Sequence, residues 1–199
     1  MKFYVSVAIA AVSLCSTVIA QQVSKEKFIN IGIKGGLNVF NINNNNNVNY
    51  DSKLGVHAGL IGHIHLARQI ALQPEIVYSV QGTKFNTAGV TTKINLGYIN
   101  VPLMFQYMFD NGFRLQAGPQ IGFLASAKSK TNNTSVDVKS SFKKVDVALG
   151  AGIGYVEPSS GLGIDVRYNL GLSDISESTA VKSTNRGFQV GLFYLFQHK

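Results

Sequence analysis

The chain has 199 residues, a formal net charge of +8 at pH 7 and a single cysteine. This length fits one domain, and one cysteine excludes a disulfide framework. The lysines are scattered rather than clustered, so the basic balance does not indicate a nucleic-acid partner. Several of them fall in segments that we expect to be loops: Lys128, Lys130, Lys139 and Lys182.

The first 20 residues have the pattern of a secretory signal peptide. Lys2 is followed by an apolar run over residues 3–14, and short residues precede a cleavage site between Ala20 and Gln21. The apolar run is shorter than the roughly 20 residues that a membrane-spanning helix needs. We therefore expect export, with residues 1–20 removed together with Cys15. Residues 21–28 would form a short periplasmic lead-in, and residues 29–199 the folded domain.

The rest of the chain shows the period-two alternation of β-strands. In residues 162–172, for example, Leu162, Ile164 and Val166 alternate with glycine and charged residues over a length that crosses a bilayer obliquely. The same pattern recurs along the chain and predicts eight strands. Their expected ranges are 29–40, 53–66, 70–84, 93–109, 113–127, 143–156, 162–172 and 186–197.

The connections between these strands alternate between short and long. Short turns surround residues 67–69, 110–112 and 157–161, whereas the other connections are mostly longer and more polar. This alternation is typical of outer-membrane barrels, which have tight periplasmic turns and longer outside loops. The sequence therefore predicts an all-β, eight-stranded antiparallel up-and-down transmembrane β-barrel. It would lie in the bacterial outer membrane with both termini on the periplasmic side.

Each predicted strand has one apolar and one polar face, so either face could line the lumen. A lipocalin-like barrel would turn its apolar face inward. We expect the opposite, because charges of both signs can pair inside a narrow barrel and aromatic residues near the short turns fit an interfacial girdle. The predicted lumen charge network comprises Lys34, Glu75, Arg114, Asp146, Asp165 and Arg167. We expect these residues to form cross-strand ion pairs that fill the lumen.

Two other patterns have features of binding sites. His57, His63 and His65 share one strand face and could suit a metal together with Glu75, but polar lumen residues are the simpler interpretation. The glycines at 150, 152 and 154 fall within a strand with no helix after them, so they are expected to make room for opposing side chains rather than to bind phosphate. We expect no catalytic residue, cofactor or metal.

Several short runs resemble one family in the right order along the chain. They cover residues 31–38, 73–78, 98–103, 117–120 and 165–169. Together they resemble the PorT-like outer-membrane β-barrel domain, which is related in architecture to the OmpA-type barrel. The resemblance implies the same barrel fold and a link to secretion or surface attachment. Members often carry Glu where this chain has Asn100, which implies a rearranged lumen network.

The last predicted strand resembles the insertion signal that the barrel-assembly machinery reads. The residues that fit it are Gln189, Gly191, Tyr194 and Phe196. The match departs from the pattern because residues 197–199 follow Phe196. An amphipathic last strand would explain most of the same residues.

Three function classes remain open. The first is a structural or interaction barrel, linked to secretion or surface attachment; the others are a narrow pore and a lipid-modifying enzyme. The enzyme would need a nucleophile and a base near the outer rim, for which His57 with Ser52 or Ser79 are the candidates. The expected partners are outer-membrane lipids, the barrel-assembly machinery and a secretion-system or surface partner.

Overall fold

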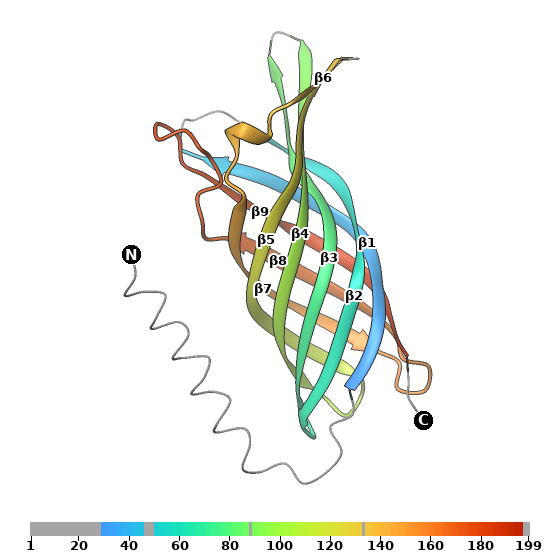
Figure 1. Cartoon of the computed structure of the whole chain (residues 1–199). Coiled ribbons are helices and arrows are strands. Elements are labelled where there is room, and N and C mark those ends of the chain that lie inside the picture. Colours follow the sequence, from blue (N-terminus) through green and yellow to red (C-terminus); the bar gives the residue numbers. More distant parts are fainter. Residues whose placement is uncertain (1–28, 46–49, 88, 133, 197–199) are drawn as a thin grey trace, which may run out of the picture.

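The structure is a computed structural model that describes residues 29–45, 50–87, 89–132 and 134–196. The predicted signal peptide, the lead-in at 21–28 and residues 197–199 lie outside the described residues. Eight long antiparallel strands close into a barrel, because β4 pairs with β5 and β1 pairs with β9 (Figure 1). These strands are β1 (Ile29–Asn44), β2 (Asp51–Ala67), β3 (Ile70–Thr87), β4 (Val90–Met108), β5 (Phe113–Thr131), β7 (Val145–Val156), β8 (Leu162–Gly171) and β9 (Ser183–Phe196).

The prediction of an eight-stranded antiparallel barrel is confirmed, but several strands are longer than expected. The chain between β5 and β7 also contains the short strand β6 (Thr134–Asp137), which pairs back onto β5, and the 3-10 turn η1 (Lys139–Ser141). Lys128 and Lys130 were expected in a loop and lie in β5 instead. Strand pairing here depends on backbone hydrogen bonds, so polar sequence outside a bilayer continues a strand without an apolar face.

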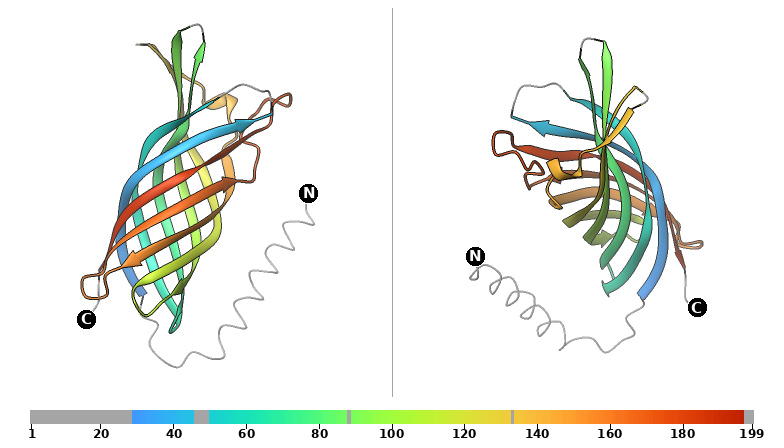
Figure 2. Two further views of the ribbon diagram at one scale, coloured as in Figure 1. Left: turned by 180° about the vertical axis from the view of Figure 1, so that it is seen from behind. Right: turned by 45° about the horizontal axis from the view of Figure 1, so that its top comes forward.

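The added length is concentrated on one side of the barrel. β3, β4 and β5 have 18, 19 and 19 residues, whereas β7 and β8 have 12 and 10. The β3–β4 hairpin and the β5–β6 hairpin consequently rise above the rest of the barrel (Figures 1 and 2). Among the described residues, no helix is long and apolar enough to cross a membrane.

The outward faces of the strands carry a continuous apolar belt. Large hydrophobic side chains point away from the lumen on every long strand, and examples are Ile33, Leu60, Ile76, Phe105, Leu115, Ile153, Val166 and Val190, each between 40% and 60% exposed. Such a surface on all sides is costly in water and matches a lipid environment. The ten residues of β8 are close to the minimum that crosses a bilayer when tilted.

The short turns gather at one end of the barrel, which we call the short-turn end. Edge-to-face aromatic pairs lie beside them on the outer surface: Tyr107 with Phe109, Phe113 with Tyr155, and Tyr194 with Phe196, at centroid distances of 5.0, 5.4 and 5.3 Å. Gly112 adopts a φ of +90° in the turn between β4 and β5, a conformation that favours glycine. Aromatic residues at such a level are typical of a membrane interface.

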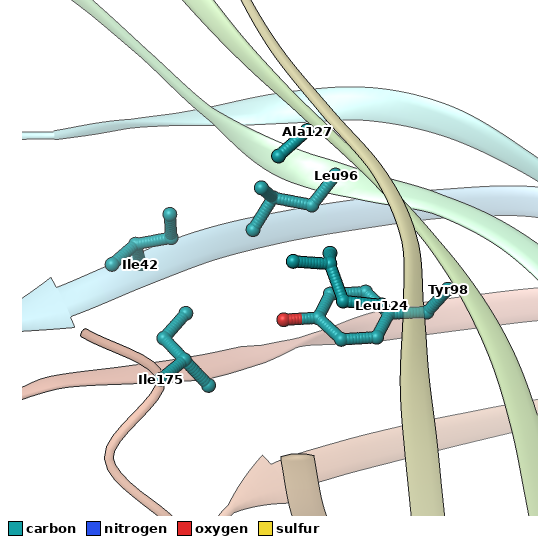
Figure 3. Packing of buried hydrophobic residues seen from close by; sticks show 6 residues of the cluster. All are labelled: Ile42, Leu96, Tyr98, Leu124, Ala127 and Ile175. Carbon is teal, nitrogen blue, oxygen red and sulfur yellow. The ribbon is translucent and has the colours of Figure 1, made fainter. Parts of the chain in front are cut away.

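The opposite end, which we call the long-loop end, is closed by an apolar cluster. Figure 3 shows its buried members, Ile42, Leu96, Tyr98, Leu124, Ala127 and Ile175. A β-bulge opposite Gly97 and Tyr98 shifts the register of β5, so that both Leu124 and Ala127 turn inward despite their odd spacing. Ile175 comes from the β8–β9 connection, which therefore folds over the mouth of the lumen.

The lumen at the short-turn end is closed by a second apolar cluster. Ile61, Val156, Phe193 and Leu195 are at most 5% exposed and pack together. The Phe193 ring lies over Gly163, where a Cβ atom would come within 2.3 Å of it. An apolar cluster thus packs toward each end of the barrel interior, and most of the buried polar residues lie between or beside these two clusters.

Candidate functional site

The centre of the lumen holds a two-point ion pair between strands on opposite sides of the barrel. Arg167 on β8 donates from Nη2 to Oε1 of Glu75 at 2.7 Å and from Nη1 to Oε2 at 3.1 Å. Both side chains are almost completely buried. Gln73 also donates to Glu75, at 2.8 Å, and Gln116 accepts from Arg167 at 3.1 Å. The planar guanidinium matches the carboxylate, which is the geometry of strong charge-assisted pairing.

A second ion pair lies beside the first. The Lys34 ammonium donates to Oδ2 of Asp165 and is 3.9 Å from Oε2 of Glu75. The same Asp165 oxygen is 3.7 Å from Nη2 of Arg167. The four side chains form what we call the central cluster, with two cations and two carboxylates. Because its charges balance, much of the cost of burying them is offset.

Glycines on neighbouring strands make the room that these side chains need. A Cβ atom at Gly150 would lie 3.3 Å from Cδ of Arg167. One at Gly191 would lie 2.8 Å from Cε of Lys34 and 2.9 Å from Oδ1 of Asp165. Gly150 on β7 thus makes room for an opposing side chain as expected, whereas a Cβ atom at Gly152 or Gly154 would first meet the backbone of β8.

Arg114 and Asp146 point into the lumen, but neither belongs to the central cluster. Arg114 donates to Gln106 at 3.3 Å and lies 3.5 Å from Nδ1 of His63, whereas Asp146 accepts from Ser173 at 2.7 Å. The expected cross-strand ion pairs for these two residues are therefore wrong. Arg114 pairs in register with Gly154 and Asp146 with Gly122. On β5, Arg114 and Gly122, the register partner of Asp146, are eight residues apart, which is about 26 Å along the strand.

A layer of uncharged polar side chains lies between the central cluster and the long-loop end. Asn38 is at its centre: it accepts from Gln189 at 3.2 Å, donates to Ser79 at 2.9 Å and lies 2.7 Å from Nδ1 of His57. Asn169 in turn donates to Gln189 at 2.9 Å. Gln73, Gln116 and Asn38 were not singled out from the sequence. Their position on the polar strand faces was the signal that could have found them.

The three histidines on β2 contact other side chains of the lumen, while Nε2 of His57 and of His63 has no hydrogen-bond partner among the described residues. His57 is part of the Asn38 layer, while the His63 and His65 rings meet edge-to-face at 4.6 Å near Arg114. His57 and Ser79 share Asn38 as a partner, but they are 3% and 0% exposed. A lipid at the outer rim would not reach either side chain. Asn100 also lines the central cluster.

The centre of the lumen, as the structure describes it, is filled. Lys34, His57, Glu75, Asn100, Gln120, Arg167 and Gln189 are among the side chains that line the gap at its centre, which has no volume for a water-sized sphere. An eight-stranded barrel has an interior that side chains can fill completely.

The four residues of the expected insertion signal divide between the two faces of β9. Gln189 is buried in the lumen, Gly191 lies against Lys34 and Asp165, and Tyr194 and Phe196 are exposed on the outer surface. The lumen contacts provide a packing reason for Gln189 and Gly191 that is independent of any assembly signal.

Two connections join across the long-loop end. Lys143 donates its backbone N–H to the Ile175 carbonyl, and its ammonium lies 2.9 Å from Asp174. Asp174 also accepts from the backbone N–H of Ser176 and of Ser183 at 3.1 and 2.9 Å. The hydrogen bond from Ser183, followed by that from Lys143, lowers the pKa of Asp174 to about 2. We call this arrangement the Asp174 latch.

Comparison with known proteins agrees with this architecture. The family model described as "outer membrane protein beta-barrel domain" matches residues 19–177. Neisserial surface protein A (NspA) superposes with a TM-score of 0.57 at 12% identity, covering 83% of this chain and 97% of that one. Ail, the attachment invasion locus protein of Yersinia pestis, has a TM-score of 0.50 at 17% identity, with 86% and 100% covered. None of the curated proteins matches.

These two structures establish likeness of fold alone. The family match covers most of the chain and agrees with the closed barrel, the apolar belt and the polar lumen described above. The chain belongs to the outer membrane protein beta-barrel domain family.

Proposed function

We propose that this protein is an interaction barrel that acts at the cell surface through its long-loop end. The observation that carries the proposal is the packed lumen: the balanced central cluster fills its centre, and an apolar cluster packs toward each end of the part that the structure describes. A barrel with a closed interior acts through its exposed surfaces. One of these is the long-loop end, where two hairpins project above the barrel (Figure 2).

The orientation follows from the general design of outer-membrane barrels. Their short turns face the periplasm and their longer loops face outward. On this basis the β3–β4 and β5–β6 hairpins extend from the cell, and the aromatic pairs at the short-turn end lie at the periplasmic interface. The barrel-assembly machinery and the outer-membrane lipids are its expected partners during insertion.

Attachment is the more specific role that we propose. Ail is an attachment invasion protein by its title, and it shares the closed eight-stranded architecture. The PorT-like sequence runs support a second candidate, a surface component of a secretion system. Both roles use the same external end, and they differ in which partner binds there.

Shortening the β3–β4 hairpin tests this proposal. Replacing residues 86–91 by Asn-Gly retains a two-residue turn and leaves the apolar belt intact. We expect the variant to remain heat-modifiable on gels, which reports a folded barrel, and to lose surface attachment or secretion of partner proteins. The control carries Ser159→Gly and Ser160→Gly at the other end. Full attachment and full secretion by the shortened variant would refute the proposal.

The pore and enzyme alternatives have separate tests. A filled lumen predicts no stable conductance for the purified protein in planar bilayers, and a large stable conductance would favour the pore. An enzyme would change the lipid mass spectrum of cells that overproduce the protein. The burial of His57 and Ser79 argues against that activity.

A further inference from the structure

Three lysines lie side by side at one level of the projecting hairpins. Lys84 on β3 is the register partner of Lys93 on β4, and Lys93 is the register partner of Lys130 on β5. Directly opposed side chains on one face have Cβ atoms about 5 Å apart, and like charges in such positions are destabilising. We call these three residues the lysine row. Its unfavourable arrangement suggests that something outside the fold compensates it.

The row faces outward. Ile94 and Leu96 pack into the apolar cluster inside the barrel, so Lys93, at odd spacing from them, lies on the opposite face of β4. Its register partners share that face. Lys128 is the partner of Asn95 and lies on the same side, one step nearer the apolar belt.

The row lies just beyond the edge of the apolar belt. We take Tyr78, which is half-exposed on the outer surface, as the edge of the belt. Its ring lies over Gly97 of β4, where a Cβ atom would come within 2.5 Å of the Tyr78 hydroxyl. Lys93 is four residues further along β4. This is about 13 Å along the strand, or a height of about 10 Å if the strand tilts by about 40°. Headgroups extend several ångströms beyond the hydrocarbon, and a lysine stem can bend back toward them.

The carboxylates nearby offset the charge of the row only in part. Among the described residues, Lys84, Lys93 and Lys130 form no ion pair within 4 Å; the register neighbours Asp51 and Asp137 face Lys84 and Lys128. Cations outnumber carboxylates over the whole long-loop end. Among the described residues, the cations are Lys53, Lys84, Lys93, Lys128, Lys130, Lys139, Lys143, Lys144, Lys182 and Arg186, and the carboxylates are Asp51, Asp137, Asp146, Asp174 and Glu177.

The pKa of Lys53 agrees with this surplus of positive charge. Lys53 lies at the same end of the barrel, just beyond the apolar residue Leu54 of β2. Partial burial, and then the charge of Lys93, lower its pKa below the ordinary value.

We propose that the lysine row binds the phosphate groups of lipopolysaccharide in the outer leaflet. Ammonium groups are point charges that bind phosphate well, and the apolar belt directly below the row would contact the acyl chains of the same lipid. A bound phosphate would also remove the repulsion between the three lysines. This inference rests on the outward orientation of the long-loop end in the proposed function.

The test compares the purified barrel in neutral detergent with two triple variants. The row variant carries Lys84→Gln, Lys93→Gln and Lys130→Gln. The control variant removes the same charge from the same end through Lys144→Gln, Lys182→Gln and Arg186→Gln. Diphosphoryl lipid A and phosphate-free lipid A are titrated into each, and binding is measured by native mass spectrometry and by the rise in unfolding temperature.

We expect the wild-type and control proteins to bind diphosphoryl lipid A at least tenfold more tightly than phosphate-free lipid A, and the row variant to lose that preference. A row variant built with arginine should keep it, which separates charge from misfolding. Equal losses in both glutamine variants would indicate diffuse attraction and overturn the proposal. An equal rise in unfolding temperature with inorganic phosphate would identify a soluble anion instead. Hairpin shortening leaves the row in place, so either proposal can fail alone.

Discussion

Arg167 and Glu75 meet across the lumen from strands that are not neighbours in the sheet. Together with Lys34 and Asp165 they form a neutral group of charges with almost no contact with solvent. Removing one member of such a group leaves its partner buried and unmatched, whereas removing an opposite pair keeps the balance. The four side chains of the central cluster therefore contribute to the stability of the barrel as a single unit.

This dependence predicts the behaviour of Arg167→Met. The substitution leaves Glu75 and Asp165 with only Lys34 as a counter-charge, and we expect a loss of about 3–5 kcal/mol in the free energy of unfolding. Adding Glu75→Gln should recover most of that loss. Unfolding in urea, followed by gel mobility, measures both.

Arg114→Met is the matched control, since it removes a lumen cation that has no carboxylate partner among the described residues. Arg114→Met should lower the free energy of unfolding clearly less than Arg167→Met does. A single Arg167→Met variant as stable as the wild-type barrel would contradict the interpretation of the central cluster.

At this scale the sequence could predict which face of the strand each side chain occupies, but not its height along the barrel axis. Alternation along a strand assigned Lys34, Glu75, Asp165 and Arg167 to the lumen, because parity depends only on position in the chain. Which charges meet depends on the register and tilt of the strands. Arg114 and Asp146 have the correct parity and are still too far along their strands to join the cluster.

At the scale of the element, each long strand separates lipid from a packed interior. Val166 on β8 is 40% exposed on the outer belt, while Val136 on β6 is exposed on a hairpin above it. The two residues have the same side chain and differ in surroundings, so they form a matched pair for testing which surface contacts lipid.

We expect Val166→Arg to lower the stability of the inserted barrel by about 2–4 kcal/mol if it lies near the bilayer midplane. Val136→Arg should change it by less than about 0.5 kcal/mol, as is usual for an exposed position. Unfolding in urea from reconstituted vesicles gives both values. Equal tolerance of the two substitutions would place the belt outside the membrane.

In the projecting hairpins, the strands predicted from the sequence end too early. Residues 128–131 are Lys, Ser, Lys and Thr, with no apolar face to mark a strand, and they were expected to form a loop. They pair instead with β4 and β6. Apolar alternation reports contact with lipid or with a core, so it cannot reveal a strand that is solvated on both sides.

The Asp174 latch joins two connections that close the long-loop end. Its carboxylate holds two backbone N–H groups and the Lys143 ammonium. Because the pKa of Asp174 is lowered from 3.8 to about 2, the latch stabilises the closed loops fully above the ordinary carboxyl pKa. That contribution is lost as the pH falls through about 2.

We therefore expect Asp174→Asn to speed hydrogen exchange at the amides of Ser176 and Ser183 roughly tenfold at neutral pH, the effect of losing one charge-assisted hydrogen bond. Glu177→Gln, in the same connection, is the control and should leave both rates unchanged. Mass spectrometry of deuterated peptides measures the rates. Unchanged exchange in Asp174→Asn would show that the carboxylate does not hold the loops together.

At the scale of the whole molecule, the barrel is asymmetric along its axis. One end has turns of a few residues with aromatic pairs beside them, and the other has long strands, joined loops and an excess of cations. If the long-loop end faces outward, lipid covers the apolar belt, while water reaches both ends of the described barrel. The two ends should then differ in their access to reagents on intact cells.

Cysteine labelling tests this orientation directly, because cleavage at Ala20 would leave the mature chain without a thiol. Cysteines at Asn45 and Thr87, both exposed at the long-loop end, should react with a membrane-impermeant maleimide on intact cells. Cysteines at Asn111 and Ser160, exposed at the short-turn end, should react only after the outer membrane is opened. Reaction of all four in opened cells is the control for folding and reagent. The reverse order of labelling would place the lysine row in the periplasm, where it would have no lipopolysaccharide to bind.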